Sequence, residues 1–285
     1  MQYTLLFTVI CLLTSCSFAK ANAEKTIVET TKAHGDKYEF CGDNDSYISN
    51  GRRQIKKRDL REFTVPAGGV LEVDGRQNGG ISVVGENRSD VLIKACVRSW
   101  ANSEAEAITS LNNTRIETSG VIRGENADVD AKFSISYKIL VPEQQDLKLN
   151  AKNGGISIKS VDGNLRFETI NGGLSLKNIS GDVKGSTTNG GVSVRLAGNS
   201  FSGNGLDVRT TNGGVKLILP KNFAADVETG TVNGGFRSEF SELQYKADSK
   251  NRWSRPKRVK ASLNGGGTKI RVMTTNGGVK IATAE

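Results

Sequence analysis

The triplet Asn-Gly-Gly recurs at a constant interval in this chain of 285 residues, and it limits what the chain can fold into. Copies begin at Asn153, Asn171 and Asn189, each eighteen residues after the last. Glycine accepts positive φ freely and asparagine tolerates it better than most residues, so each triplet predicts a sharp turn. Turns at a fixed interval predict an internal repeat in which each unit is one supersecondary element.

Between the triplets, apolar and polar residues alternate. In NGGISIKSV, Ile156 and Ile158 alternate with Ser157 and Lys159, which is the period of two typical of a half-buried strand. We expect the fourth, sixth and ninth residues of each nine-residue half-repeat to point inward. The ninth residues are Val161, Ile170, Ile179, Thr188 and Ala197.

Two architectures fit these strands: an antiparallel meander with one strand per nine residues, and a solenoid that stacks eighteen-residue coils in parallel. The full triplet returns only every eighteen residues, with Asp162-Gly163-Asn164 halfway. This interval favours an all-β fold, a single-stranded parallel β-helix or solenoid built from two-strand coils with Asn-Gly-Gly turns. One coil buries too little apolar surface to be stable alone, so several must stack.

Stacked coils would align equivalent side chains in columns, where asparagine amides can bond to the copies above and below. The same alignment would bring Lys159, Lys177 and Arg195 together, where like charges repel. One copy of the triplet precedes this repeat, and further copies follow it at wider spacing. The predicted turn asparagines are Asn78, Asn153, Asn171, Asn189, Asn212, Asn233 and Asn276.

The first 23 residues carry an export signal. Leu5 to Leu13 is an apolar run, too short to span a bilayer, and Ala21-Asn22-Ala23 fits a cleavage site. Two interpretations stay open: cleavage after Ala23, or a lipoprotein signal in which Cys16 is lipidated. Either predicts export from a bacterial cytoplasm to the periplasm, outer membrane or cell surface. A membrane contact is expected only through such a lipid.

We divide the chain into the signal (1–23), a polar N-terminal segment (24–62) and a repeat domain (63–285) with a basic insertion (236–263). Outside the leader, the chain has two cysteines, Cys41 and Cys96. In an oxidising compartment they most simply form a disulfide, against the alternative of two buried thiols. Residues 103–111 start with a Ser-x-x-Glu capping box and predict a short helix.

The formal net charge is +9, and two basic clusters contribute to it. The first spans Arg52 to Arg61. The second surrounds an aromatic residue that could stack on a sugar ring, which makes it the better candidate for binding a glycan or other polyanion. Its members are Lys250, Arg252, Trp253, Arg255, Lys257, Arg258 and Lys260. The alternative is a solvated loop face. No specific nucleic-acid partner is predicted, and the oligomeric state stays open.

Catalytic and metal-binding patterns are missing from the sequence. The one histidine, His34, lies in a polar segment without a neighbouring nucleophile. No zinc, phosphate-loop or calcium-roll motif is present, and the acidic residues of the repeats are scattered. We therefore predict no enzyme, no metal and no cofactor.

Several segments in order, among them VLEVDGRQNGGISVVG, ISYKILVPEQQDLKLNAKNGGISIKSVDGNL and LNGGGTKIRVMTTNGGVKIA, resemble the bacterial putative-adhesin β-strand-repeat family. The resemblance covers about residues 63–285. It implies an exported β-helical domain of unknown function with no assigned catalysis and no defined functional residues.

The function expected from the sequence is a non-enzymatic, adhesin-like scaffold or binding protein of the cell envelope. One alternative is a structural envelope protein that stacks end to end, because the last predicted strand, GGVKIATAE, would leave an unpaired edge at the C-terminus. A second alternative is a carbohydrate-active enzyme built on the same scaffold.

Overall fold

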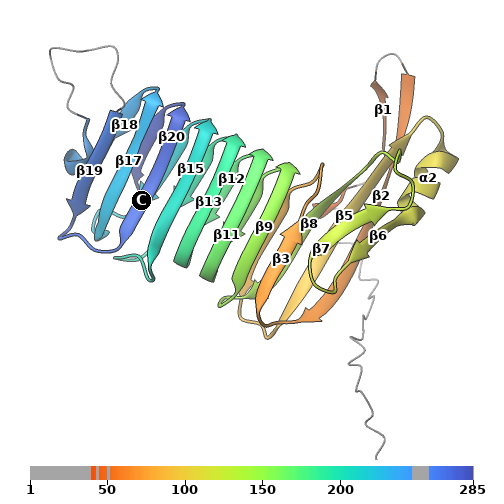
Figure 1. The fold of residues 1–285 in the computed structure, drawn as a ribbon, viewed down its shortest axis with the longest axis horizontal. Helices are drawn as coiled ribbons and strands as arrows, with labels where there is room; N and C mark the ends of the chain where they lie inside the picture. Colours follow the sequence, from red (N-terminus) through yellow and green to blue (C-terminus); the bar gives the residue numbers. More distant parts are fainter. Residues whose placement is uncertain (1–39, 43–44, 50–51, 246–256, 285) are drawn as a thin grey trace, which may run out of the picture.

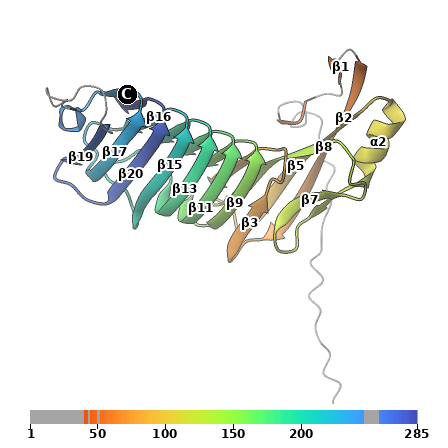
Figure 2. The ribbon, with the colours of Figure 1, turned by 45° about the horizontal axis from the view of Figure 1, so that its top comes forward.

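The computed structural model describes residues 40–42, 45–49, 52–245 and 257–284. Cys16, Ala23 and His34 lie outside these residues. The described chain forms two long sheets that face each other along a rod, with strands running across its long axis (Figure 1, Figure 2). The all-β prediction is confirmed, and the fold is β-solenoid-like.

Sheet A has eleven strands, in the spatial order β1 (Asp45–Ser49), β2 (Arg52–Pro66), β5 (Asp90–Ala101), β8 (Phe133–Pro142), β4 (Ile81–Glu86), β10 (Ile156–Lys159), β12 (Leu174–Lys177), β14 (Val192–Arg195), β16 (Val215–Leu219), β21 (Val279–Thr283) and β18 (Phe236–Ser238).

Sheet B has ten strands, in the order β19 (Lys257–Leu263), β17 (Ala225–Asn233), β20 (Lys269–Asn276), β15 (Gly205–Asn212), β13 (Ser180–Asn189), β11 (Asp162–Asn171), β9 (Asp146–Asn153), β3 (Val70–Asp74), β7 (Ile122–Asn126) and β6 (Thr114–Glu117). The described helices are α2 (Glu104–Asn113) and a short 3-10 helix, η1 (Ser241–Leu243).

Neighbouring strands in the repeat run parallel, so the antiparallel meander is wrong. In sheet A, Ile156 pairs with Leu174 and Leu174 pairs with Val192. Each pair is separated by eighteen residues, and the chain enters sheet B between them. The inward side chains therefore form files along the rod, and all three of these residues are at most 2% exposed.

The predicted ninth inward position holds at two of the five residues and fails at the other three. Val161 and Ile179 are buried, but Ile170 is 46% exposed, and Thr188 and Ala197 are exposed too. At Ile170 and Thr188 the reason is that β11 and β13 stay extended up to their asparagines, so strict alternation buries Thr169 and Thr187 instead. After β14, Leu196 is buried in place of Ala197.

Gly185 occupies an inward position but has no side chain to bury. The space beside it is filled by a side chain of the neighbouring strand. A Cβ at Gly185 would lie 1.9 Å from the ring of Phe167, which is itself 1% exposed. The large side chain of β11 therefore occupies the space that β13 leaves empty.

The C-terminal unit does not lie at the end of the rod. Strand β20 sits between β15 and β17, and β21 sits between β16 and β18, so the last strands of the chain are inserted between two earlier units (Figure 1). The predicted open edge at the C-terminus is therefore wrong. Strand β18 ends sheet A, and β19, which pairs antiparallel with β17, ends sheet B.

At the other end of the rod, β2, β5 and β8 pair antiparallel. Strand β2 runs through the expected boundary at residues 62–63, so sheet A begins within the segment expected to be polar and irregular. The strand is polar because most of its described side chains are only half-buried. The predicted disulfide is present: Cys41 is bonded to Cys96 of β5.

The capping-box helix is also present, because the Ser103 side chain accepts a hydrogen bond from the Glu106 backbone N–H at the start of α2. Among the helices described, none has the length and apolar character needed to cross a membrane.

Candidate functional site

The predicted turn asparagines are brought together in one ladder of side-chain hydrogen bonds. Each amide Nδ2 donates to the Oδ1 of the asparagine on the next strand, at 2.8 Å in five cases and 3.2 Å at the last. The spatial order is Asn233, Asn276, Asn212, Asn189, Asn171, Asn153 and Asn78. The ladder follows the order of strands in the rod, with the inserted C-terminal unit in second place.

A column of buried threonines lies beside the asparagines. The Oγ1 of Thr169, Thr187 and Thr210 donates to a glycine carbonyl of the preceding triplet at 2.7 to 2.8 Å. Thr274 does the same to Gly213. These bonds satisfy carbonyls that the turn removes from the strand ladder. The threonines therefore stabilise the corner.

The two glycines of each triplet differ in their surroundings. A Cβ on the first glycine would overlap the unit next to it: at Gly190 it would lie 2.1 Å from the Gly172 carbonyl oxygen. A Cβ on the second glycine has more room, 3.4 Å from the Gly214 oxygen at Gly191 and 3.6 Å from the Gly235 oxygen at Gly278. The first glycine is required by packing, whereas the second leaves open surface.

The outer face of sheet B carries charges that are paired. Arg166 contacts Asp182 at 2.6 Å, and Arg209 contacts Asp207 at 2.6 Å. Arg271 lies 3.3 Å from Asp207 and also contacts Glu228 of β17. The pKa of Asp182 is held below its ordinary value chiefly by the hydrogen bond from Arg166. Most charges on this face are therefore paired, although Glu168 of β11 lies at no ion-pair distance from a cation in the described part of the chain.

Glu228 of β17 is a buried carboxylate that is only 6% exposed. Burial alone would raise its pKa, but the hydrogen bond from Lys269 and the charges of Lys260 and Arg271 outweigh burial and lower the pKa overall. Lys269 lies 3.3 Å from the carboxylate. The carboxylate is therefore held ionised by its cations.

The outer face of sheet A is different. Six consecutive strands each present one exposed cation, and we call this set the cation track. Its members are Lys159, Lys177, Arg195, Lys216, Lys280 and Arg237. Within the ranges that the structure covers, none of the six lies at ion-pair distance from a carboxylate. The cations of the track are therefore not neutralised as most of those of sheet B are.

The register shows how the track crosses the face. Lys159, Lys177 and Arg195 are directly paired neighbours in one row. From β16 onward the cation moves to the parallel row, where Lys216 pairs with Lys280 and Lys280 with Arg237. The nearby Glu239 weakens the field at Lys216 and Lys280, but its carboxylate accepts both hydrogen bonds from Thr283.

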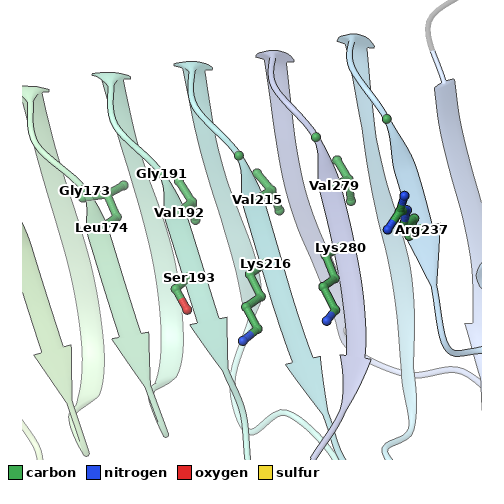
Figure 3. A pocket seen from close by; sticks show the side chains of 13 residues that line it. Gly173, Leu174, Gly191, Val192, Ser193, Val215, Lys216, Arg237, Val279 and Lys280 are labelled. Carbon is green, nitrogen blue, oxygen red and sulfur yellow. The ribbon is translucent and has the colours of Figure 1, made fainter.

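A groove of about 850 Å³ runs beside the second row of the track. Its floor is the column of second glycines, including Gly191, and its wall includes Lys216, Lys280 and Arg237 (Figure 3). Ser193 continues the row on the next strand (Figure 3). The groove is open to solvent and elongated across several strands, so it suits an extended polymer better than a compact ligand.

The basic cluster predicted from the sequence is divided by the structure. Lys250, Arg252, Trp253 and Arg255 lie outside the described residues. The remaining three lie on β19, and each has a partner. Lys257 donates to the Gly234 carbonyl at 2.6 Å. Arg258 and Lys260 lie 3.6 and 3.8 Å from Glu228. Polyanion binding at this cluster stays a prediction.

The first basic cluster holds α2 against β2. Lys57 forms an ion pair with Glu104 at the start of the helix, and Arg61 donates to the Leu111 carbonyl at its end. These two side chains therefore bind the protein's own helix.

Sequence reasoning recognised only half of the cation track. It aligned Lys159, Lys177 and Arg195, and treated their repulsion as a cost. It did not extend the track to Lys216 and Lys280, although both follow an identical NGGV segment. That shared NGGVK motif was the signal, and Arg237 sits at the matching position of NGGFR.

Known proteins offer distant comparisons. The chain is similar to a putative cell adhesion protein from Clostridium sporogenes, with 13% identity and a TM-score of 0.44 over 80% of this chain and 100% of the other. It is also similar to a putative adhesin from Bacteroides fragilis, with 10% identity and a TM-score of 0.30 over 79% and 97%. A search of curated proteins finds no match.

A family model described as Toastrack DUF4097 matches residues 76–282, which include strands of both sheets from the turn before β4 into β21. The match includes the seven turn asparagines. The chain therefore belongs to the Toastrack DUF4097 family.

Proposed function

We propose that this protein is an exported, non-enzymatic, adhesin-like scaffold of the bacterial envelope that binds an anionic polymer on the outer face of sheet A. The observation that carries the proposal is the cation track: one exposed cation from each of six consecutive strands, none in an ion pair among the described residues. The opposite face pairs its charges, so the difference is a property of this face.

The spacing of the track suits a polymer. Neighbouring strands lie about 4.8 Å apart, so the six cations extend over about 24 Å. Two like charges held about 4.8 Å apart would repel by about 1 kcal/mol in water. A chain of sulfate, phosphate or carboxylate groups would offset this repulsion at every step, and the attraction would fall with salt.

We infer that the repeat unit is an eighteen-residue, two-strand coil turned at Asn-Gly-Gly. The interval between paired residues and the asparagine ladder support this inference. Stacked coils form a stiff rod, which holds the cations at fixed positions before a ligand arrives. A pre-organised array loses less conformational entropy on binding than flexible lysines would.

Export is part of the proposal. It is supported by the apolar leader and by the Cys41–Cys96 disulfide, a bond typical of oxidising compartments. Whether the leader is cleaved after Ala23, or before a lipidated Cys16 that becomes the first mature residue, is a separate prediction, which mass spectrometry of the mature N-terminus tests.

The absence of catalysis is also a proposal. A general acid on a β-helix needs a carboxyl whose pKa is raised toward the working pH. In this protein, the Asp182, Asp207 and Glu228 carboxyls have their pKa values lowered by neighbouring cations. Such carboxylates are suited to ion pairing and poorly suited to donating a proton.

Heparin affinity chromatography tests the proposed function. The perturbed protein is a triple variant on the groove wall: Lys216→Gln, Lys280→Gln and Arg237→Gln. We expect it to elute at clearly lower salt than the parent. The matched control removes the same charge from sheet B, through Lys148→Gln, Lys184→Gln and Arg209→Gln, and should elute close to the parent after allowance for net charge.

Two outcomes would contradict the proposal. Equal losses from both triple variants would show that retention follows net charge alone. Loss only from a third variant, with Lys250, Arg252 and Arg255 changed to Gln, would place the polyanion site at the cluster predicted from the sequence. Circular dichroism confirms that each variant keeps its strand content.

A further inference from the structure

A second concavity, separate from the cation track, lies at the opposite end of the rod. It has a volume of about 670 Å³ and takes its walls from both sheets. We call it the N-terminal pocket. Trp100 of β5 and Tyr137 of β8 contribute from sheet A, Gly124 of β7 contributes from sheet B, and Asn78 contributes from the turn before β4. Its volume is in the range of small-molecule sites.

The most unusual group in this pocket is the Tyr137 hydroxyl. Tyr137 is 1% exposed, and its hydroxyl has no hydrogen-bond partner among the described residues. Buried hydroxyls are almost always paired, because an unpaired one loses its bonds to water without replacement. Burial raises the pKa of Tyr137, so the hydroxyl stays protonated and available as a donor.

A second free donor comes from the end of the asparagine ladder. The Oδ1 of Asn78 accepts from Asn153, but its Nδ2 donates to no group in the described part of the chain. All six bonds of the ladder point the same way, so the amide dipoles add along the rod. Hydrogen bonds in such a chain strengthen one another, which makes the Asn78 amide a better donor than an isolated amide.

The remaining walls combine aromatic surface with balanced charge. Trp100 and Phe133 are half-buried and supply the apolar part. Arg76 is paired with Glu125 at 2.9 Å, and Lys132 and Asp128 add one charge of each sign. The formal charge of the lining is therefore zero, in contrast to the cation track. A neutral ligand suits this pocket better than an anion.

We propose that the N-terminal pocket binds a neutral saccharide unit. A sugar ring offers one apolar face of C–H groups, which would lie on the Trp100 ring, and a rim of hydroxyl oxygens. Those oxygens would accept hydrogen bonds from the Tyr137 hydroxyl and the Asn78 Nδ2. The proposal does not depend on the polyanion function, since the two sites share no residue of the cation track.

Tryptophan fluorescence tests the proposal directly. The chain has two tryptophans, so a Trp253→Phe background leaves Trp100 as the reporter. The probes are glucose, galactose, mannose and N-acetylglucosamine, each titrated separately, with glucuronic acid as the charged comparison. We expect at least one neutral sugar to change the emission of Trp100 saturably, and glucuronic acid to bind more weakly.

Two substitutions remove one donor each. Tyr137→Phe deletes the hydroxyl without changing the ring, and Asn78→Asp keeps the oxygen that accepts from Asn153 while removing the amide donor. Each should weaken sugar binding about tenfold or more, which corresponds to about 1.4 kcal/mol. Because the deleted hydroxyl has no partner, Tyr137→Phe should be at least as stable as the parent. The control is Tyr245→Phe, at the far end of the rod, which should leave binding unchanged.

Three results would overturn the proposal. The first is no saturable response to any of the four neutral sugars. The second is stronger binding of glucuronic acid than of every neutral sugar. The third is unchanged affinity in both the Tyr137→Phe and Asn78→Asp variants, with strand content kept as judged by circular dichroism.

Discussion

The two glycines of a single triplet provide a sharp test of the stacked repeat. Gly190 and Gly191 are adjacent, but an added methyl group would meet different surroundings. At Gly190 the new Cβ would lie 2.1 Å from the Gly172 carbonyl oxygen, whereas at Gly191 it would lie 3.4 Å from the nearest oxygen. Neither glycine has a positive φ, so the comparison isolates packing from backbone strain.

The magnitude for Gly190→Ala follows from the contacts that must break. Relieving the overlap requires a shift of about 1 Å, and overpacking of this kind costs about 1–3 kcal/mol. The shift also disturbs two hydrogen bonds, from Thr187 Oγ1 to the Gly172 oxygen and from the Gly190 N–H to the Asn212 oxygen. At about 1 kcal/mol each, the total is about 3–5 kcal/mol.

Gly191→Ala should have the opposite sign or no effect. Its Cβ makes an ordinary contact, and replacing glycine within extended backbone removes about 0.5–1 kcal/mol of unfolded-state entropy. Thermal unfolding followed by circular dichroism distinguishes the two. We expect Gly190→Ala to lower the Tm by about 10 °C or more and Gly191→Ala to change it by less than about 3 °C. Similar Tm values for both variants would refute close stacking at the first glycine.

Three further predictions concern the corner, the disulfide and the ion pairs. Thr210→Val should cost about 1–2 kcal/mol in urea denaturation, because the Gly190 carbonyl loses its donor; an unchanged midpoint would show that the bond contributes nothing. Reducing the Cys41–Cys96 bond, which joins residues separated by 55 positions, should cost about 2–4 kcal/mol and lower the Tm, as non-reducing and reducing melts would show. The folded-state pKa of Glu228 is lowered, so its ion pairs stabilise the protein above the unfolded pKa of about 4.3 and this contribution is lost as the pH falls through the folded pKa. Glu228→Gln should therefore be less stable than the parent at pH 7 and approach it below about pH 4; an equal gap at both pH values would contradict the assignment.

The sequence predicted the repeat well because its information is local. Asn-Gly-Gly favours a turn, and alternation of apolar and polar residues favours a strand. The eighteen-residue interval then predicted which strands are neighbours, and Asn153, Asn171 and Asn189 are indeed hydrogen-bonded in that order. The Cys41–Cys96 bond was predictable too, since the chain offers no other pair outside the leader.

Other features depend on contacts that a single strand does not reveal. The ninth position was assigned by the apolar character of Ile170, but the buried residue is Thr169. A threonine can be buried there only because its hydroxyl reaches the Gly154 carbonyl, which belongs to a different turn. Likewise, Gly185 looks like a defect until the Phe167 ring is placed beside it. Both cases require knowledge of the neighbouring strand.

The spatial order of the last units could not be predicted from the sequence, for a different reason. Periodicity predicts that the unit containing Asn276 pairs with an Asn-Gly-Gly unit, but it does not say which one. In the rod that unit lies between those of Asn212 and Asn233. All three units present equivalent backbones, so local patterns do not distinguish the possible orders. At that end of sheet B, β19 is the edge strand and pairs antiparallel with β17.

The contrast between the two faces is the strongest indication of function in the molecule. Both faces use the same strand spacing and the same alternation, so geometry alone would allow either to pair its charges. In sheet B, Asp182 and Asp207 neutralise the arginines beside them. In sheet A, the equivalent row carries serines and then cations, and paired neighbours such as Lys216 and Lys280 repel each other. A surface can be well solvated without this repulsion, as the paired charges of sheet B show. The two runs of three aligned cations, Lys159 to Arg195 and Lys216 to Arg237, therefore support the proposal of a ligand that carries negative charge.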